Sequence, residues 1–205
     1  MRPDRFKAVF CLAVPYSPRG KASLFDVVKA AGHGDNFYMF EQIRPDADQI
    51  WANAAVTIPG ILYWASGSAP APEAWNPFDP ARSLHRKAPD RLPAWIERDY
   101  LAHDIAEFQR TGFHGALNYY RAIQPFFDLS GAYLGARITQ PSYFIWGKAN
   151  GLFPIYHLTE AKLRDGLPGL AGYVGLDGIG HWVQHEAADE VSERLVTFAR
   201  SVSPS

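Results

Sequence analysis

The chain has 205 residues, of which 47% are hydrophobic and 20% are charged. This composition predicts a globular protein with one core, or with one core and an inserted subdomain, and excludes a disordered chain. Its 20 basic and 21 acidic residues give a net charge of -1, so no basic field is available to bind nucleic acid or an anionic membrane. The single Cys11 excludes an internal disulfide and fits a reducing compartment. We therefore expect a cytoplasmic protein with no nucleic-acid or membrane partner.

The first element expected is a strand over residues 8–14, an uninterrupted apolar run that contains Cys11. A short run of this kind is typical of a strand buried on both faces of a parallel sheet, so Cys11 is expected to be a buried, inert thiol. The next 120 or so residues contain no clear strand. They contain an irregular segment rich in Pro, Ala and Ser over 67–93. Helices are expected over 23–31, 46–65 (broken or kinked at Pro59-Gly60), 96–111 and 117–123.

The pattern changes from Ile138 onward, where apolar runs and amphipathic segments alternate. We expect a strand over 141–147, a helix over 155–163, a strand over 170–176 and a closing helix over 186–200. Strand–helix alternation implies parallel strands joined by right-handed crossovers. The predicted fold class is therefore α/β, with few parallel strands in residues 1–16 and 137–205 and a large, mostly helical insertion over 17–136 between the first and second strands.

His181 is the first candidate for chemistry, in the segment Gly-His-Trp-Val-Gln-His-Glu of residues 180–186. It follows a predicted strand and precedes a predicted helix, and loops at the carboxyl ends of parallel strands commonly carry catalytic residues. Its side chain suits a general base, and a packing or capping histidine is the equal alternative. His185 lies four residues on, but the order His-x-x-x-His-Glu is not the His-Glu-x-x-His pattern and lacks further ligands. We expect no metal and no cofactor.

Four segments, in order, resemble the α/β-hydrolases of the soluble epoxide hydrolase type. The segment at 112–121, Gly-Phe-His-Gly-Ala-Leu-Asn-Tyr-Tyr-Arg, discriminates best, because other α/β-hydrolases share the histidine segment but not Leu-Asn-x-Tyr-Arg. The other three are residues 2–9, which resemble the stretch shortly after the nucleophile elbow, residues 138–147, which resemble the strand before the catalytic acid, and residues 180–186 around His181. The resemblance is to the C-terminal part of such a protein, its lid and last strands, and it makes residues 17–136 the helical lid.

The resemblance implies a mechanism and a role for three residues. In the family an aspartate on the nucleophile elbow attacks an epoxide carbon, two lid tyrosines donate hydrogen bonds to the epoxide oxygen, and a histidine oriented by an acid activates water to hydrolyse the ester. His181 matches the histidine and Tyr120 matches the tyrosine of Leu-Asn-x-Tyr-Arg. Tyr38 falls at the other tyrosine, although the residues after it depart from the family pattern. The alternative for either tyrosine is a ring that only packs in the lid.

Two departures from the family bear on activity. The acid position is occupied by Asn150, whose neutral amide can orient a histidine but cannot stabilise an imidazolium; Asp128 or another carboxylate is the alternative acid. No segment matches Gly-x-Ser-x-Gly or its aspartate variant, and the small-residue runs at 32–35 and 65–68 come nearest. We therefore expect that the chain lacks the N-terminal nucleophile segment and is inactive alone.

Two further interpretations remain open. A haloalkane or haloacid dehalogenase shares the aspartyl ester and the histidine, although its lid usually presents Trp or Asn to a halide. A non-catalytic remnant that binds an apolar ligand or another protein would account for Asn150. In each case a small apolar substrate or ligand is the expected partner, and an exposed edge of the strand at 8–14 predicts homo-oligomers.

Overall fold

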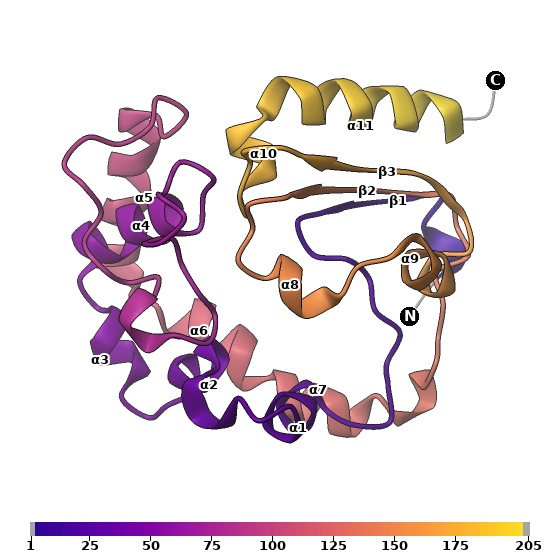
Figure 1. Cartoon of the computed structure of the whole chain (residues 1–205), viewed down its shortest axis with the longest axis horizontal. Coiled ribbons are helices and arrows are strands. Elements are labelled where there is room, and N and C mark those ends of the chain that lie inside the picture. The colour runs from indigo at the N-terminus through magenta and orange to yellow at the C-terminus, as the bar shows by residue number, and fades with distance from the viewer. Residues whose placement is uncertain (1–2, 203–205) are drawn as a thin grey trace. The chain divides into compact units, whose positions relative to one another are not determined.

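The computed structural model describes residues 3–202 (Figure 1). Residues 1–2 and 203–205, which include Arg2 of the first motif and the ends of the expected core segments, lie outside the described residues. The chain divides into two compact units. The sheet unit comprises Met1–Arg19, Ser66–Ser68 and Gly135–Ser205 within the described range, and the helical unit comprises Gly20–Ala65 and Ala69–Leu134. The sequence did not indicate that Ser66–Ser68 belongs to the sheet unit.

Three parallel strands form the sheet of the first unit: β1 (Val9–Leu12), β2 (Ser142–Gly147) and β3 (Leu170–Leu176), in the order β1-β2-β3. This arrangement confirms the α/β class and the helical insertion between the first and second strands. Strand β1 is shorter than the predicted 8–14. It ends because Ala13 adopts a φ of 58°, and the Val14 amide donates to the Leu12 carbonyl at 2.6 Å, which turns the chain out of the extended conformation.

Helices cover both faces of this sheet, as Figure 1 shows. They are α8 (Phe153–Tyr156), α9 (Glu160–Gly166), α10 (Val183–Glu186) and α11 (Ala188–Val202). Alternate side chains of β2 point to opposite faces. Ile145 packs with Val183 and Val191 on the side of α10 and α11, whereas Phe144 packs with Leu163 on the side of α9.

Cys11 lies on the side of α9, half-buried, with Phe144 and Trp146. Burial raises the pKa of its thiol. The thiol therefore stays protonated at neutral pH.

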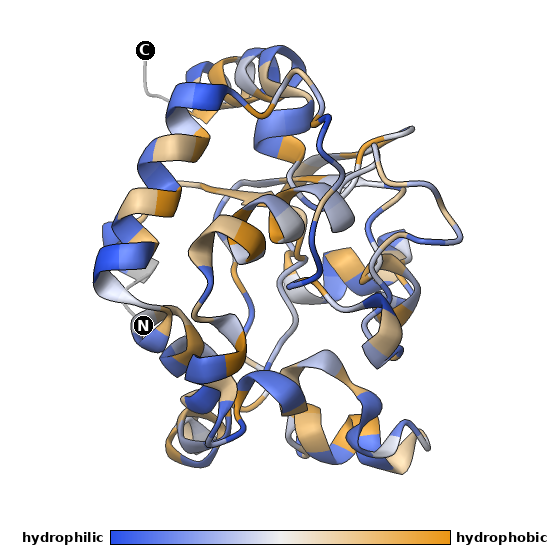
Figure 2. Ribbon diagram, turned by 90° about the vertical axis from the view of Figure 1, so that its left-hand side faces the viewer, coloured by the Kyte–Doolittle hydropathy of each residue, from blue (hydrophilic) through white to orange (hydrophobic). Residues whose placement is uncertain are grey.

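Seven α-helices of the second unit lie between Leu24 and Leu129: α1 (Leu24–Ala30), α2 (Tyr38–Gln42), α3 (Ala47–Trp51), α4 (Ala54–Trp64), α5 (Arg98–Thr111), α6 (His114–Arg121) and α7 (Ile123–Leu129). Their core is built around Trp51 and Leu117, with Leu101, Ile105 and Phe108 of α5 packed against it. The helix expected over 96–111 is confirmed as α5, and Figure 2 shows hydrophilic and hydrophobic segments alternating along the helices. Within residues 3–202, no helix combines the length and hydropathy that a membrane span requires.

Two predicted helices differ from the observed ones. The break expected at Pro59-Gly60 is wrong, since α4 runs through both residues; the helix expected over 46–65 is interrupted at residues 52–53, between α3 and α4. The alternative, a kink at Pro59-Gly60, stays a prediction. Gly60 serves a close approach of two backbones, because a Cβ there would lie 2.2 Å from the carbonyl oxygen of Arg86. The single helix expected over 155–163 is two, because His157 takes a left-handed φ of 42° and Thr159 caps α9 by accepting from the Lys162 amide.

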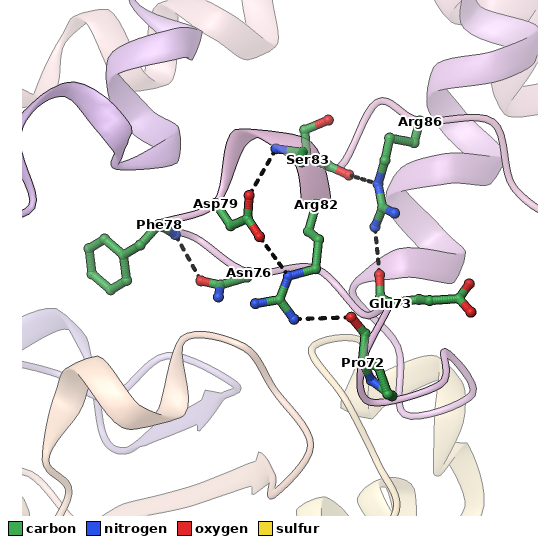
Figure 3. Close-up of polar contacts among 9 residues, drawn as sticks. Pro72, Glu73, Asn76, Phe78, Asp79, Arg82, Ser83 and Arg86 are labelled. Atoms are coloured by element: carbon green, nitrogen blue, oxygen red, sulfur yellow. Dashed lines mark hydrogen bonds and ion pairs between the residues drawn. The ribbon is translucent and has the colours of Figure 1, made fainter.

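The irregular segment expected after α4 is confirmed, and its side chains hold it in place (Figure 3). Arg82 donates to the carbonyl oxygen of Pro72 at 3.3 Å. Arg86 donates to the carbonyl oxygens of Glu73 at 2.7 Å and Ser83 at 2.9 Å. These guanidinium groups satisfy carbonyls that have no partner in a regular element, so the segment is ordered without being helical.

Candidate active site

His181 lies in the loop between β3 and α10, at the carboxyl end of the parallel sheet. Its ring meets the ring of Trp182 edge-on, with centroids 4.9 Å apart, and its Nδ1 atom is shielded from solvent. Burial lowers the pKa of His181 to about 4. The imidazole is therefore neutral at pH 7 and is able to accept a proton.

Glu186, the last residue of α10, holds the backbone of this loop. Its Oε2 atom accepts hydrogen bonds from the amides of Gly180 at 3.0 Å and Gly67 at 2.8 Å, and its Oε1 atom accepts from the amide of Trp182 at 3.0 Å. Glu186 was expected only as a part of the histidine segment and as the start of the helix over 186–200, with no role of its own. Its bond to Gly67, 119 residues away, has no local signal in the sequence.

Asn150 is 3% exposed and follows β2 in the sheet unit. Its Oδ1 atom accepts from the amide of Leu152 at 3.0 Å, and its Nδ2 atom donates to the carbonyl oxygen of Ala13 at 3.5 Å. An amide satisfies both partners, whereas a carboxylate would repel the Ala13 carbonyl. Asn150 thus ties the loop after β2 to the end of β1.

Two carboxylates are candidates to replace the catalytic acid, whose position is occupied by Asn150. One was predicted from the sequence, and the other lies in the loop that carries His181. Asp128, the predicted alternative, lies on α7 in the helical unit and accepts from Gln124 at 2.9 Å. Asp177 follows β3 in the same loop as His181, but its carboxylate pairs with Lys148 at 3.0 Å and is 87% exposed. A carboxylate paired with His181 would raise the pKa of the histidine, whereas burial lowers it.

The structure brings Tyr38 and Tyr120 together in the helical unit. Tyr38 begins α2 and Tyr120 lies near the end of α6; their ring centroids are 6.2 Å apart, with the planes at 77°. Burial chiefly raises the pKa of Tyr120, Tyr119 adds to the rise, and a hydrogen bond with Gln42 opposes it. The Tyr120 phenol therefore keeps its proton at neutral pH and is available as a donor.

A cavity of about 510 Å³ lies beside Tyr38, within the helical unit. Its walls include the aromatic rings of Trp51 and Trp75, and Tyr38 meets Trp75 edge-on at a centroid distance of 5.0 Å. A Glu41–His85 pair, with Oε1 and Nδ1 3.3 Å apart, adds a polar wall. No group of three His, Cys, Asp or Glu side chains among residues 3–202 is arranged to hold a metal ion.

Comparisons with known proteins identify relatives of the chain. No protein-family model matches the chain. An epoxide hydrolase of Caballeronia sordidicola is 65% identical over 202 residues, which are 98% of this chain and 61% of that protein. Epoxide hydrolase A of Mycobacterium tuberculosis is 31% identical, over 97% of this chain and 62% of its own length.

Solved structures agree with the sequence comparison. The epoxide hydrolase from an endophytic Streptomyces superposes with a TM-score of 0.86 at 32% identity, covering 98% of this chain and 63% of that one. The chain spans about three fifths of the length of the relatives that it matches. It is a homologue of the epoxide hydrolases, and its fold is that of the corresponding part of an α/β-hydrolase of this type.

Proposed function

We propose that this chain supplies the tyrosines and the histidine of an epoxide hydrolase, which converts a small apolar epoxide to a vicinal diol through an aspartyl ester. The observation that carries the proposal is the pairing of Tyr38 with Tyr120 at 6.2 Å in a homologue of epoxide hydrolases. An epoxide oxygen becomes an alkoxide as the ring opens, and two neighbouring phenols are suitable hydrogen-bond donors to it.

In the first step a carboxylate oxygen bonds to one epoxide carbon and the C–O bond to the ring oxygen breaks. The tyrosine phenols donate hydrogen bonds to that oxygen while it gains charge, and one phenol transfers its proton to it, so the step yields a hydroxyalkyl ester and a phenolate. In the second step His181 accepts a proton from the water that attacks the ester carbonyl and returns it to the departing diol oxygen. The carboxylic acid so formed loses its proton to the phenolate, which becomes a phenol again. The products are the diol and the regenerated carboxylate.

The aspartate of the first step belongs to a segment outside this sequence, because none of the 205 residues matches the nucleophile elbow. The chain by itself therefore opens no epoxide. The aromatic cavity beside Tyr38 favours a small substrate with an apolar body. The protein works in the cytoplasm, where its single cysteine stays reduced. Fractionation of cells that produce it tests this location, and recovery of the protein outside the cytoplasmic fraction would contradict it.

A hybrid protein tests this function. It joins the 205 residues to the part of the Caballeronia sordidicola protein that they do not match, and at 65% identity the two parts should assemble. Diol formation from styrene oxide is measured by chromatography. We expect the hybrid to form the diol, and Tyr120→Phe and Tyr38→Phe each to lower kcat by about a hundredfold, since each removes one donor to the developing alkoxide.

Tyr119 provides a matched control. It adjoins Tyr120, is 76% exposed, and meets the Tyr120 ring edge-on, so Tyr119→Phe should change kcat less than twofold. Equal rates for all three phenylalanine variants would refute the assignment of the tyrosines. Halide release from a chloroalkane without diol formation from the epoxide would instead make the protein a dehalogenase.

A further inference from the structure

The carboxylate of Glu186 accepts three hydrogen bonds from main-chain amides. Two of them come from Gly180 and Trp182, the residues on either side of His181. The third comes from Gly67, which is 119 residues away in the chain. One half-buried side chain therefore fixes both backbone flanks of His181 and ties them to the segment Ser66–Ser68 of the same unit.

Close backbone packing restricts the same loop on two further sides. A Cβ on Gly67 would lie 1.9 Å from the carbonyl oxygen of Gly178, and a Cβ on Gly147 would lie 2.1 Å from that of Gly180. The amide of Ala149 also donates to the carbonyl of Ile179 at 2.9 Å. Residues 178–180 are therefore in close backbone contact with Gly67, Gly147 and Ala149, and Glu186 binds the amides on either side of His181.

Glu186 is not arranged as an acid partner of His181. Both of its oxygens are engaged by amides, and a carboxylate paired with an imidazole would raise the histidine pKa, whereas that of His181 is lowered by burial. An effect of Glu186 on His181 must then be carried by the backbone.

We propose that Glu186 is a positioning residue for His181, whose carboxylate holds residues 180–182 against Ser66–Ser68 and so aims the imidazole at the ester in the second step. This inference rests on the proposed function. A displacement of about 1 Å in a reacting group can cost a hundredfold in rate.

The two-step mechanism makes this role measurable in the hybrid protein. If His181 is displaced, the ester forms at the normal rate but is hydrolysed slowly, so it accumulates. We expect Glu186→Gln to lower kcat at least tenfold, to lower KM with it, and to leave kcat/KM within threefold. Rapid quenching after mixing with styrene oxide, followed by intact-mass measurement, should show the covalent adduct. The variant is informative because an amide has one acceptor oxygen and its NH2 group opposes a main-chain N–H.

The comparison variants separate the possible failures. Glu193→Gln, an exposed change on α11, should behave as the wild type. His181→Gln should accumulate the adduct more strongly than Glu186→Gln. Adduct with His181→Gln but none with Glu186→Gln overturns the positioning role alone, whereas adduct with neither variant overturns the proposed function. A loss of folded protein would lower the amount of diol without accumulating the ester.

If Glu186→Gln does not fold, amide hydrogen exchange in the wild-type hybrid protein gives the answer. The amides of Gly67, Gly180 and Trp182, from which the Glu186 carboxylate accepts, should all exchange slowly with solvent. Rapid exchange at these three amides would overturn the inference.

Discussion

At the scale of single residues, the sheet unit carries a neutral, half-buried histidine, and the helical unit carries phenols that keep their protons. His181 has its pKa lowered to about 4 and Tyr120 has its pKa raised, both chiefly by burial. Burial favours the neutral form of each group. The two groups therefore stay in the protonation states that a base and a hydrogen-bond donor require over the whole neutral range.

The low pKa of His181 predicts a loss of stability in acid. The unfolded histidine has a pKa near 6.5, so between about pH 6.5 and 4 the unfolded chain binds the proton more tightly and the free energy of unfolding falls as pH falls. The part of the free energy of unfolding that comes from neutral His181 is complete above pH 6.5, and about 3 kcal/mol of it is lost by pH 4. Urea denaturation of the wild type and His181→Gln at pH 7.5 and 4.5 should show that the variant loses less stability by about 2 kcal/mol. Parallel losses in both proteins would show that His181 is not buried as described.

At the scale of elements, the sequence predicted the elements whose signals are local and missed those set by contacts between distant segments. The three strands and helix α5 follow from apolar runs and a 3.6-residue period, and they lie where expected. The break at Pro59-Gly60 was wrong because α4 continues through both residues, and the glycine is required by the close approach of Arg86, 26 residues on. Glu186 was missed for the same reason, since its partner Gly67 is remote in sequence.

The site divides in the same way. The roles of His181, Tyr120 and Tyr38 are predictions from the resemblance of short segments, and the rings of the two tyrosines lie in contact. The bonds of Asn150 to Ala13 and Leu152 could not be predicted, because they depend on how the loop after β2 meets the end of β1.

Two glycines of the helical unit provide a prediction at this scale. Gly60→Ala places a methyl group 2.2 Å from the carbonyl oxygen of Arg86, whereas Gly115→Ala in α6 meets nothing within 4 Å. We expect the first change to lower the free energy of unfolding by about 2–4 kcal/mol through overpacking, and the second to raise it by up to about 1 kcal/mol through helix propensity. Chemical denaturation of the two variants measures both, and equal effects would contradict the close approach at Gly60.

At the scale of the whole molecule, strand β1 has a neighbouring strand on one side only within the described residues. An unpaired edge with the sequence Val-Phe-Cys-Leu is a template for association. We propose that isolated copies of the 205-residue chain pair through this edge. Sedimentation velocity should show dimers or larger species for the chain, and a monomer for the hybrid protein, in which the added segment covers β1. A monomeric chain would contradict this proposal.

The central claim is that these 205 residues hold the tyrosines and the histidine of an epoxide hydrolase but not its nucleophile. Diol formation from styrene oxide by the purified chain, beside the hybrid and its His181→Ala variant, tests it most directly. The account predicts no diol from the chain, turnover by the hybrid, and loss of that turnover in the variant. Diol formation by the chain alone that His181→Ala abolishes would show that a nucleophile lies within these residues, and the claim would be wrong.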